Sequence, residues 1–265
     1  MKTNIIILLI GLFFSSHSNA QDSIQKVPVF DYHNDFNRIL KETQNEESDL
    51  NYNKLLERFQ NNDSTLSNQE TLALMIGFTK NQYFKPQLDT LIELEISDLR
   101  KKRNYREAIT KANQYLKTHP LSYLALKEIA ISYYQQSKNF EKEMKLDSSV
   151  LFIDSGRYYG IRHSKIFDAM RYSGKGNDPN SPIFSLGLTD GEHFITDAGH
   201  KIEQKDVDWN NYGDFIEIIS AAKNLEAKLY FFIIQHAKAI IDEEEDKKIK
   251  AQKEADKKGS GKKKS

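Results

Sequence analysis

The chain has 265 residues, with 38 basic and 38 acidic side chains, so its formal net charge is zero. It contains no cysteine, which excludes disulfides, thiolate zinc sites, iron–sulfur clusters and cysteine nucleophiles. Only 12 glycines and 5 prolines occur, whereas aromatic residues reach 11%, so the composition argues against a disordered or loop-dominated chain and favours helices.

The first twenty residues have the pattern of a secretory signal peptide. Lys2 gives a short positive start, Ile5 to Phe14 are mainly apolar, and small residues end at Ala20. The apolar run is shorter than the ~20 residues of a spanning helix, which argues against a membrane anchor. We therefore expect an exported protein, periplasmic or secreted and without a transmembrane segment, whose mature chain starts at Gln21. The lack of cysteine excludes a lipoprotein.

Residues 21–50 are polar and weakly patterned, and we expect them to form a lead-in arm. Helical periodicity begins near residue 51, where Tyr52, Leu55, Leu56 and Phe59 share one face. Ser67 and Glu70 have the spacing of a capping box and predict a second helix. Pro86 is suited to the start of a third helix. Its buried residues are expected to be its apolar ones: Leu88, Leu91, Ile92, Leu94, Ile96 and Leu99.

The segment from about 88 to 150 has an internal period. Tyr105 and Phe140 are 35 residues apart, each is expected to open a short helix, and the helix at 124–134 lies between them. This resembles divergent tetratricopeptide-type repeats of paired helices. Tyr105, Ala108 and Pro120 match that pattern, whereas Glu143 stands where alanine is expected and the second unit has no closing proline. A further helix is predicted over 158–172.

The stretch 173–182 is the richest in helix-breaking residues and marks the main boundary of the chain. Beyond it, the spacing of apolar residues shortens toward two. We expect a strand at 183–188, a turn at Asp190 and Gly191, a return strand at 193–196, and further strands at 214–220 and 228–235. Together these segments predict an antiparallel sheet of three to four strands.

The predicted fold is therefore α+β, with an N-terminal tetratricopeptide-like α-helical array followed by a small antiparallel β-sheet region. The divisions are a signal peptide (1–20), a polar lead-in arm (21–50), a helical region (51–172), a small β-rich region (173–241) and a charged, disordered tail (242–265). The tail has five acidic residues followed by a segment of net charge +7, whereas residues 21–241 have net charge −3. An anionic surface is a candidate partner of the lysine-rich end. Specific nucleic-acid binding is not expected, because the tail has no aromatic residues for base stacking.

The order of several short segments resembles a family of exported bacterial proteins, the domain-of-unknown-function family 4919. This resemblance spans about residues 51–235 and implies helices first and a β-rich end, but no activity. The segments that support it are Tyr52–Phe59, Leu66–Glu70, Gly77–Phe78, Lys85–Pro86, Ser173–Gly176, Tyr212–Phe215 and Leu229–Ile233.

Two groups of residues were weighed as chemical sites. Gly174, Lys175 and Gly176 suggest a phosphate loop, but they lack the following Ser or Thr and precede a strand, so a linker is the better interpretation. The densest polar group offers N and O ligands to a divalent metal, although its spacing matches no known metal motif and a hairpin with polar turn residues is favoured. Its members are Asp190, Glu192, His193, Asp197 and His200.

No catalytic, metal-binding or cofactor-binding residue is assigned from the sequence, and no cofactor is expected. The functional hypothesis is a non-catalytic exported module that binds an unknown peptide or protein partner through the helical array. The alternative is a hydrolase or metal-dependent enzyme with a site near residues 173–200, because active sites assemble from distant residues.

Overall fold

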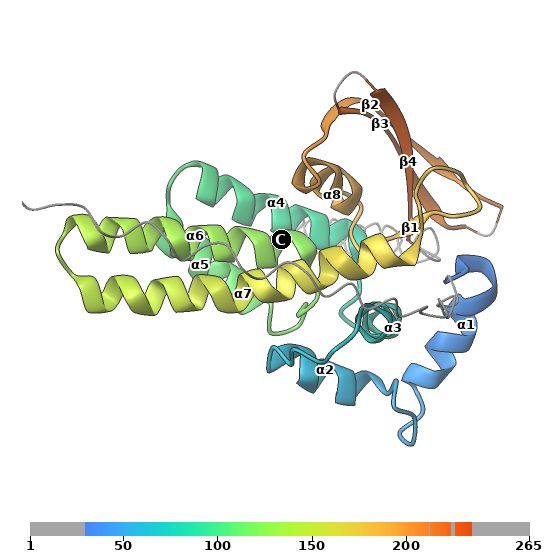
Figure 1. Cartoon of the computed structure of the whole chain (residues 1–265), viewed down its shortest axis with the longest axis horizontal. Helices are drawn as coiled ribbons and strands as arrows, with labels where there is room; N and C mark the ends of the chain where they lie inside the picture. Colours follow the sequence, from blue (N-terminus) through green and yellow to red (C-terminus); the bar gives the residue numbers. More distant parts are fainter. Residues whose placement is uncertain (1–29, 212, 224–225, 235–265) are drawn as a thin grey trace, which may run out of the picture.

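The computed structural model describes residues 30–211, 213–223 and 226–234, which form a helical body and a small sheet (Figure 1). The predicted signal peptide and the charged tail lie outside these residues. The helices are α1 (Tyr32–Thr43), α2 (Tyr52–Gln60), α3 (Asn68–Phe78), α4 (Pro86–Lys101), α5 (Tyr105–Tyr115), α6 (Tyr123–Lys142), α7 (Leu146–Ser173) and α8 (Asp190–Asp197). The strands are β1 (Ile183–Phe184), β2 (Lys201–Trp209), β3 (Phe215–Lys223) and β4 (Glu226–Ile234). The predicted α+β class is confirmed.

The segment expected to be a polar arm contains helix α1. Asp31 caps the helix by accepting hydrogen bonds from the backbone amides of His33 and Asn34. Phe36 and Ile39 are buried in the core, and α1 packs on α3. Few apolar residues are enough here, because they are spaced at three to four positions and share one face of the helix.

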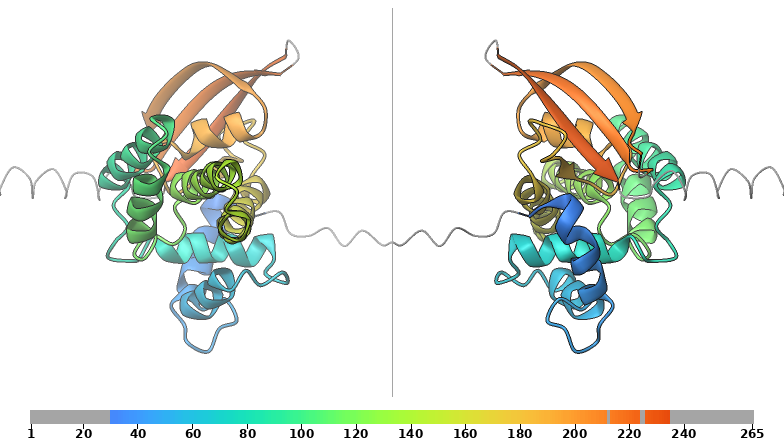
Figure 2. Two further views of the ribbon diagram at one scale, coloured as in Figure 1. Left: turned by 90° about the vertical axis from the view of Figure 1, so that its left-hand side faces the viewer. Right: turned by 90° about the vertical axis from the view of Figure 1, so that its right-hand side faces the viewer.

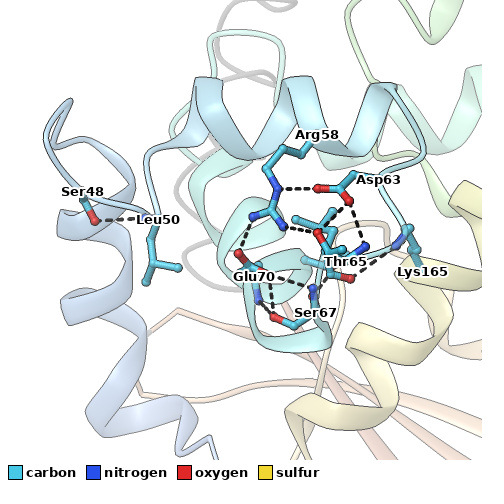
Figure 3. Close-up of polar contacts among 10 residues, drawn as sticks. Ser48, Leu50, Arg58, Asp63, Thr65, Ser67, Glu70 and Lys165 are labelled. Carbon is cyan, nitrogen blue, oxygen red and sulfur yellow. Dashed lines mark hydrogen bonds and ion pairs between the residues drawn. The ribbon is translucent and has the colours of Figure 1, made fainter.

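The capping box at the start of α3 is confirmed. Ser67 Oγ accepts from the Glu70 amide at 3.2 Å, and Glu70 Oε2 accepts from the Ser67 amide at 2.8 Å. Arg58 of α2 donates to Asp63 at 2.7 Å and also pairs with Glu70 (Figure 3). The same carboxylate therefore caps α3 and ties it to α2. Residues 71–78 of α3 are all buried, which makes this helix the centre of the core.

Replacing Ser67 with alanine should lower the free energy of unfolding by about 1 kcal/mol, because one amide at the start of α3 loses its hydrogen-bond acceptor. Urea denaturation followed by circular dichroism measures the loss. Ser64→Ala is the matched control at an exposed serine of the preceding turn, and it should change stability by less than about 0.5 kcal/mol. Equal losses in the two variants would contradict the role given to Ser67.

The four strands form one mixed sheet in the order β1-β4-β3-β2. β2 and β4 are antiparallel to β3, but β1 pairs with β4 in parallel, so the prediction of a purely antiparallel sheet was wrong. A parallel neighbour needs a long connection, and here the chain passes through α8, β2 and β3 between β1 and β4. The predicted strands near 214–220 and 228–235 are confirmed as β3 and β4. β2 was not predicted, because its residues are charged and exposed along most of an edge strand.

Helix α8 replaces the predicted hairpin at residues 190–196. It lies between the sheet and the helical body, where it contacts α6 on one side and β2 and β3 on the other (Figures 1 and 2). Phe194 and Ile195 are buried in these contacts. Asp190 and Gly191 therefore start a helix and do not form a turn between two strands.

The α6–α7 pair differs from the predicted repeat. Phe140 lies in the last turn of α6, which continues to Lys142, so the prediction that Phe140 opens a helix was wrong. The reversal comes at Met144, which adopts a φ of 59°, and α7 then extends for 28 residues. Tyr105 does open a helix, as predicted. Within the described residues, none of the helices combines the length and apolar character needed to cross a bilayer.

Helix α4 buries only part of the predicted apolar set. Ile96 is buried as predicted, but Leu91 and Leu94 are 59% and 42% exposed, whereas Asp89, Glu93 and Ser97 are buried. These three polar residues are four positions apart and therefore form one stripe along the helix. Leucines occur on several sides of α4, so apolar spacing alone did not define the inner face.

Candidate functional site

A small cavity lies where α4, the α5–α6 connection and α8 meet. Its volume of ≈ 20 Å³ leaves room for roughly one water-sized group. Aromatic and aliphatic side chains form most of the wall, and three carboxyl groups also line it. The lining residues are Phe78, Phe84, Asp89, Glu93, Tyr115, His119, Leu121, Ser122, Tyr123, Leu186, Gly187 and Asp190.

The cavity draws its carboxyl groups from two helices that are far apart in the sequence. Asp89 and Glu93 are one turn apart on α4, and Asp190 is the first residue of α8. Their exposed fractions are 8%, 3% and 2%, respectively. Acidic side chains are almost never this buried without partners, so each of the three requires an account of its hydrogen bonds.

Asp190 is held by backbone amides on one oxygen only. Its Oδ2 accepts from the amides of Leu186 at 3.2 Å and Gly187 at 2.7 Å. Its Oδ1 has no hydrogen-bond partner among the described residues. Burial raises the pKa of Asp190, and the two amides offset only part of this effect. A side chain at position 187 would begin 2.7 Å from Oδ1, so glycine is needed for this close approach.

Glu93, like Asp190, has a hydrogen-bonded oxygen and an oxygen without a hydrogen bond among the described residues. Ser122, the N-cap of α6, donates to its Oε1, while no hydrogen bond to its Oε2 is found in the described part of the chain. Burial raises the pKa of Glu93 well above its ordinary value, and the nearby charge of Asp190 adds to this effect. The neighbouring Tyr115 hydroxyl also has a raised pKa, because it is buried and faces these carboxyl groups.

Asp89 differs from the other two because a histidine faces it. Its Oδ1 lies 3.0 Å from His119 Nε2, and its Oδ2 accepts from the Lys85 amide at 2.9 Å. Burial lowers the pKa of His119, but the hydrogen bond and charge of Asp89 outweigh it, so the net shift is upward. The imidazole stacks on Tyr115 with the ring centres 4.2 Å apart. His119 is therefore held beside Asp89, which favours its protonated form.

A second polar cluster lies behind Tyr123, one of the cavity residues. Asp197, at the end of α8, accepts from Tyr123 Oη at 2.7 Å and Lys127 Nζ at 2.5 Å. His163 Nε2 lies 3.4 Å from the same carboxylate. These partners lower the pKa of Asp197 in spite of its burial. The cluster ties α8 to α6 and α7 and thereby fixes the position of Asp190.

On the sheet side of α8, a fourth buried carboxyl group has its own cation. Glu217 of β3 is 1% exposed and lies 3.1 Å from Lys205 Nζ of β2, which also pairs with Glu192. Burial nevertheless raises the pKa of Glu217 to about 7. Glu217 packs against Gly191 and does not line the cavity.

The five candidate metal ligands predicted from the sequence do not converge. Asp190 faces the cavity, Glu192 pairs with Lys205 and Asp197 binds Tyr123 and Lys127. His193 is half-buried, and this desolvation lowers its pKa, while the His200 ring packs edge-on against Tyr230. Within residues 30–211, 213–223 and 226–234, no group of three or more His, Cys, Asp or Glu side chains is placed to hold a metal ion.

The glycine-rich segment at 174–176 forms a loop closed on itself. The Gly176 amide donates to the Ser181 carbonyl at 2.8 Å, and the Lys175 amide donates to Ser181 Oγ at 3.1 Å. Both amides are therefore used within the loop, which leads into β1.

Sequence reasoning missed Asp89 and Glu93 altogether. The available signal was their spacing with Ser97, since three polar residues at intervals of four occur in a helix otherwise rich in leucine. Such a stripe normally faces solvent. Only the position of α4 against α6 and α8 shows that this one faces inward.

The fold and the cavity define an α+β protein with a helical body, a small mixed sheet and a carboxyl-lined site between them. Residues 37–242 match the family model described as "Domain of unknown function (DUF4919)", which covers more than half of the chain. The chain therefore belongs to this family. No curated protein and no solved structure matches it.

Proposed function

We propose that the chain is an exported, non-catalytic binding module whose peptide or protein ligand contacts the cavity between α4, the α5–α6 connection and α8. The observation that carries this proposal is the inward polar stripe of α4. Burying Glu93 opposite Asp190 leaves two carboxyl oxygens without hydrogen bonds, and this opposes folding. Local violations of folding rules of this kind are expected at functional sites.

The arrangement of the helices supports a binding role. α4 and α5 form one antiparallel pair, α6 and α7 form a longer one, and the pairs pack together through α4, α5 and α6 (Figure 1). Stacked helix pairs in tetratricopeptide-like arrays present surfaces for extended peptides. In this proposal α8 and the sheet cover one end of the array. Asp190 is the residue of α8 that takes part in the site.

The residues that line the cavity favour binding over hydrolysis. Buried acids with raised pKa values are also typical of general acids, which is the argument for the alternative of an enzyme near residues 173–200. Of the five polar residues predicted in that segment, only Asp190 lines the cavity.

Selection of a random peptide library on the mature chain, residues 21–265, tests the proposal. The counter-target is the double variant Glu93→Gln, Asp190→Asn, which keeps the size of both side chains and removes their charge. We expect selected peptides to bind the wild-type chain at least tenfold more tightly than the variant. Selection that returns only peptides binding both proteins equally would contradict the proposed site. Mass spectrometry of the bound peptides tests the alternative function. Peptides that the wild-type chain cleaves and the double variant leaves intact would indicate a hydrolase.

A further inference from the structure

We infer that the cavity is a receptor for a primary ammonium group, such as the end of a lysine side chain. This inference rests on the proposed function, since it names the chemical group of the ligand that the site would hold. It is carried by the two carboxyl oxygens that have no hydrogen bond among the described residues, the excess of carboxyl groups over cations around the cavity and the chemistry of the wall.

The charges around the cavity are unbalanced. Asp89 has His119 at 3.0 Å, but the donors to Glu93 are the neutral hydroxyls of Ser122 and Tyr115, and those to Asp190 are backbone amides. The charge of His163 also acts on Asp190, but His163 and Lys127 both pair with Asp197. A cation brought by a ligand would therefore add to the few that the described residues place near the three carboxyl groups.

The hydrogen-bonding capacity also fits an ammonium group. Such a group has three N–H donors and no acceptor. Glu93 Oε2 and Asp190 Oδ1 are acceptors without hydrogen bonds, and both belong to side chains that are at least 97% buried and line the cavity. Charge-assisted hydrogen bonds to buried carboxylates are among the stronger polar interactions in proteins.

The number of donors and the chemistry of the wall distinguish an ammonium group from other cations. An ammonium group brings three donors to the two free acceptor oxygens, whereas a planar guanidinium brings five and would leave more of its donors without partners. A metal ion would need three or more close ligands, and the described His, Asp and Glu side chains do not provide them. Phe78, Phe84 and Leu121 offer apolar surface to the methylene groups of an alkyl chain, and the aromatic faces attract a cation.

The matched probes n-butylamine, n-butanol and n-butylguanidine test the inference on the mature chain. They share one alkyl chain and differ in the head group. Binding is measured by isothermal titration calorimetry and by NMR shifts of the amides of Gly187 and Asp190. We expect n-butylamine to bind at least tenfold more tightly than the other two. Its affinity should rise from pH 6 to pH 9, because the two carboxyl groups must lose their protons while the amine, with a pKa of about 10.4, stays charged.

Three variants locate the binding. Glu93→Gln and Asp190→Asn should each weaken n-butylamine binding at least tenfold, whereas Glu217→Gln, which removes a buried carboxyl group outside the cavity, should leave it unchanged. Equal binding of n-butylamine and n-butanol, or binding that survives both cavity substitutions, would overturn the inference. If the chain selects peptides that depend on Glu93 and Asp190 but binds no amine, the ammonium inference fails while the proposed function stands. Circular dichroism of each variant confirms that loss of binding is not loss of folding.

Discussion

Replacing Arg100 with alanine should lower the free energy of unfolding by about 3–5 kcal/mol at pH 8. Arg100 of α4 donates from Nη2 to Glu128 Oε1 at 3.0 Å, and its Nε also donates to Oε2. Glu128 of α6 is 2% exposed and also accepts a hydrogen bond from Ser97 Oγ at 3.0 Å. Without Arg100, the protein must bury the Glu128 carboxylate without its cation, which costs free energy.

Urea denaturation at pH 8 measures this effect. Arg157→Ala is the matched control, since Arg157 and its partner Asp154 are 65% and 59% exposed, and it should change stability by less than about 1 kcal/mol. The double variant Arg100→Leu, Glu128→Leu should recover most of the loss, as buried ion pairs replaced by apolar residues often do. A loss below 1 kcal/mol in Arg100→Ala would show that this pair does not hold α4 on α6.

The elements that the sequence predicted correctly are those with a local cause. The capping box of Ser67 and Glu70, the proline at the start of α4 and the apolar face of α2 act within one or two turns, and the structure confirms all three. Each depends on residues at most seven positions apart. Nothing from the rest of the fold is needed to satisfy them.

The failures have long-range causes. Glu93 faces inward because Ser122, 29 residues away, donates to it, and Asp190 faces inward because α8 is packed between α6 and the sheet. Gly191 suggested a turn, but a side chain there would begin 2.6 Å from the Phe232 ring, so glycine serves the packing of α8 against the sheet. The candidate site was missed for the same reason, since it exists only where these distant elements meet.

Glu93→Gln should stabilise the folded chain at neutral pH. Glutamine has the shape of the protonated acid and avoids the cost of ionising a buried group. Below the unfolded pKa of about 4.5, Glu93 is protonated in both states and the variant gains nothing. Above it the unfolded chain releases the proton while the folded chain keeps it, because burial raises the folded pKa. The wild type should therefore lose stability relative to the variant as the pH rises above about 4.5, by about 1.4 kcal/mol per pH unit until the folded pKa is reached.

Glu217→Gln is the matched control for this slope. The pKa of Glu217 is raised to about 7, so the advantage of its variant should grow between pH 4.5 and 7 and then level off. Urea midpoints from pH 4 to pH 9 give both curves, and a flat curve for Glu93→Gln would refute the buried, protonated acid. A variant that is more stable yet no longer binds amines would show that Glu93 is kept at the expense of stability, as expected for a residue that serves a ligand and not the fold. Loss of stability together with loss of binding would instead assign Glu93 to the packing of α4.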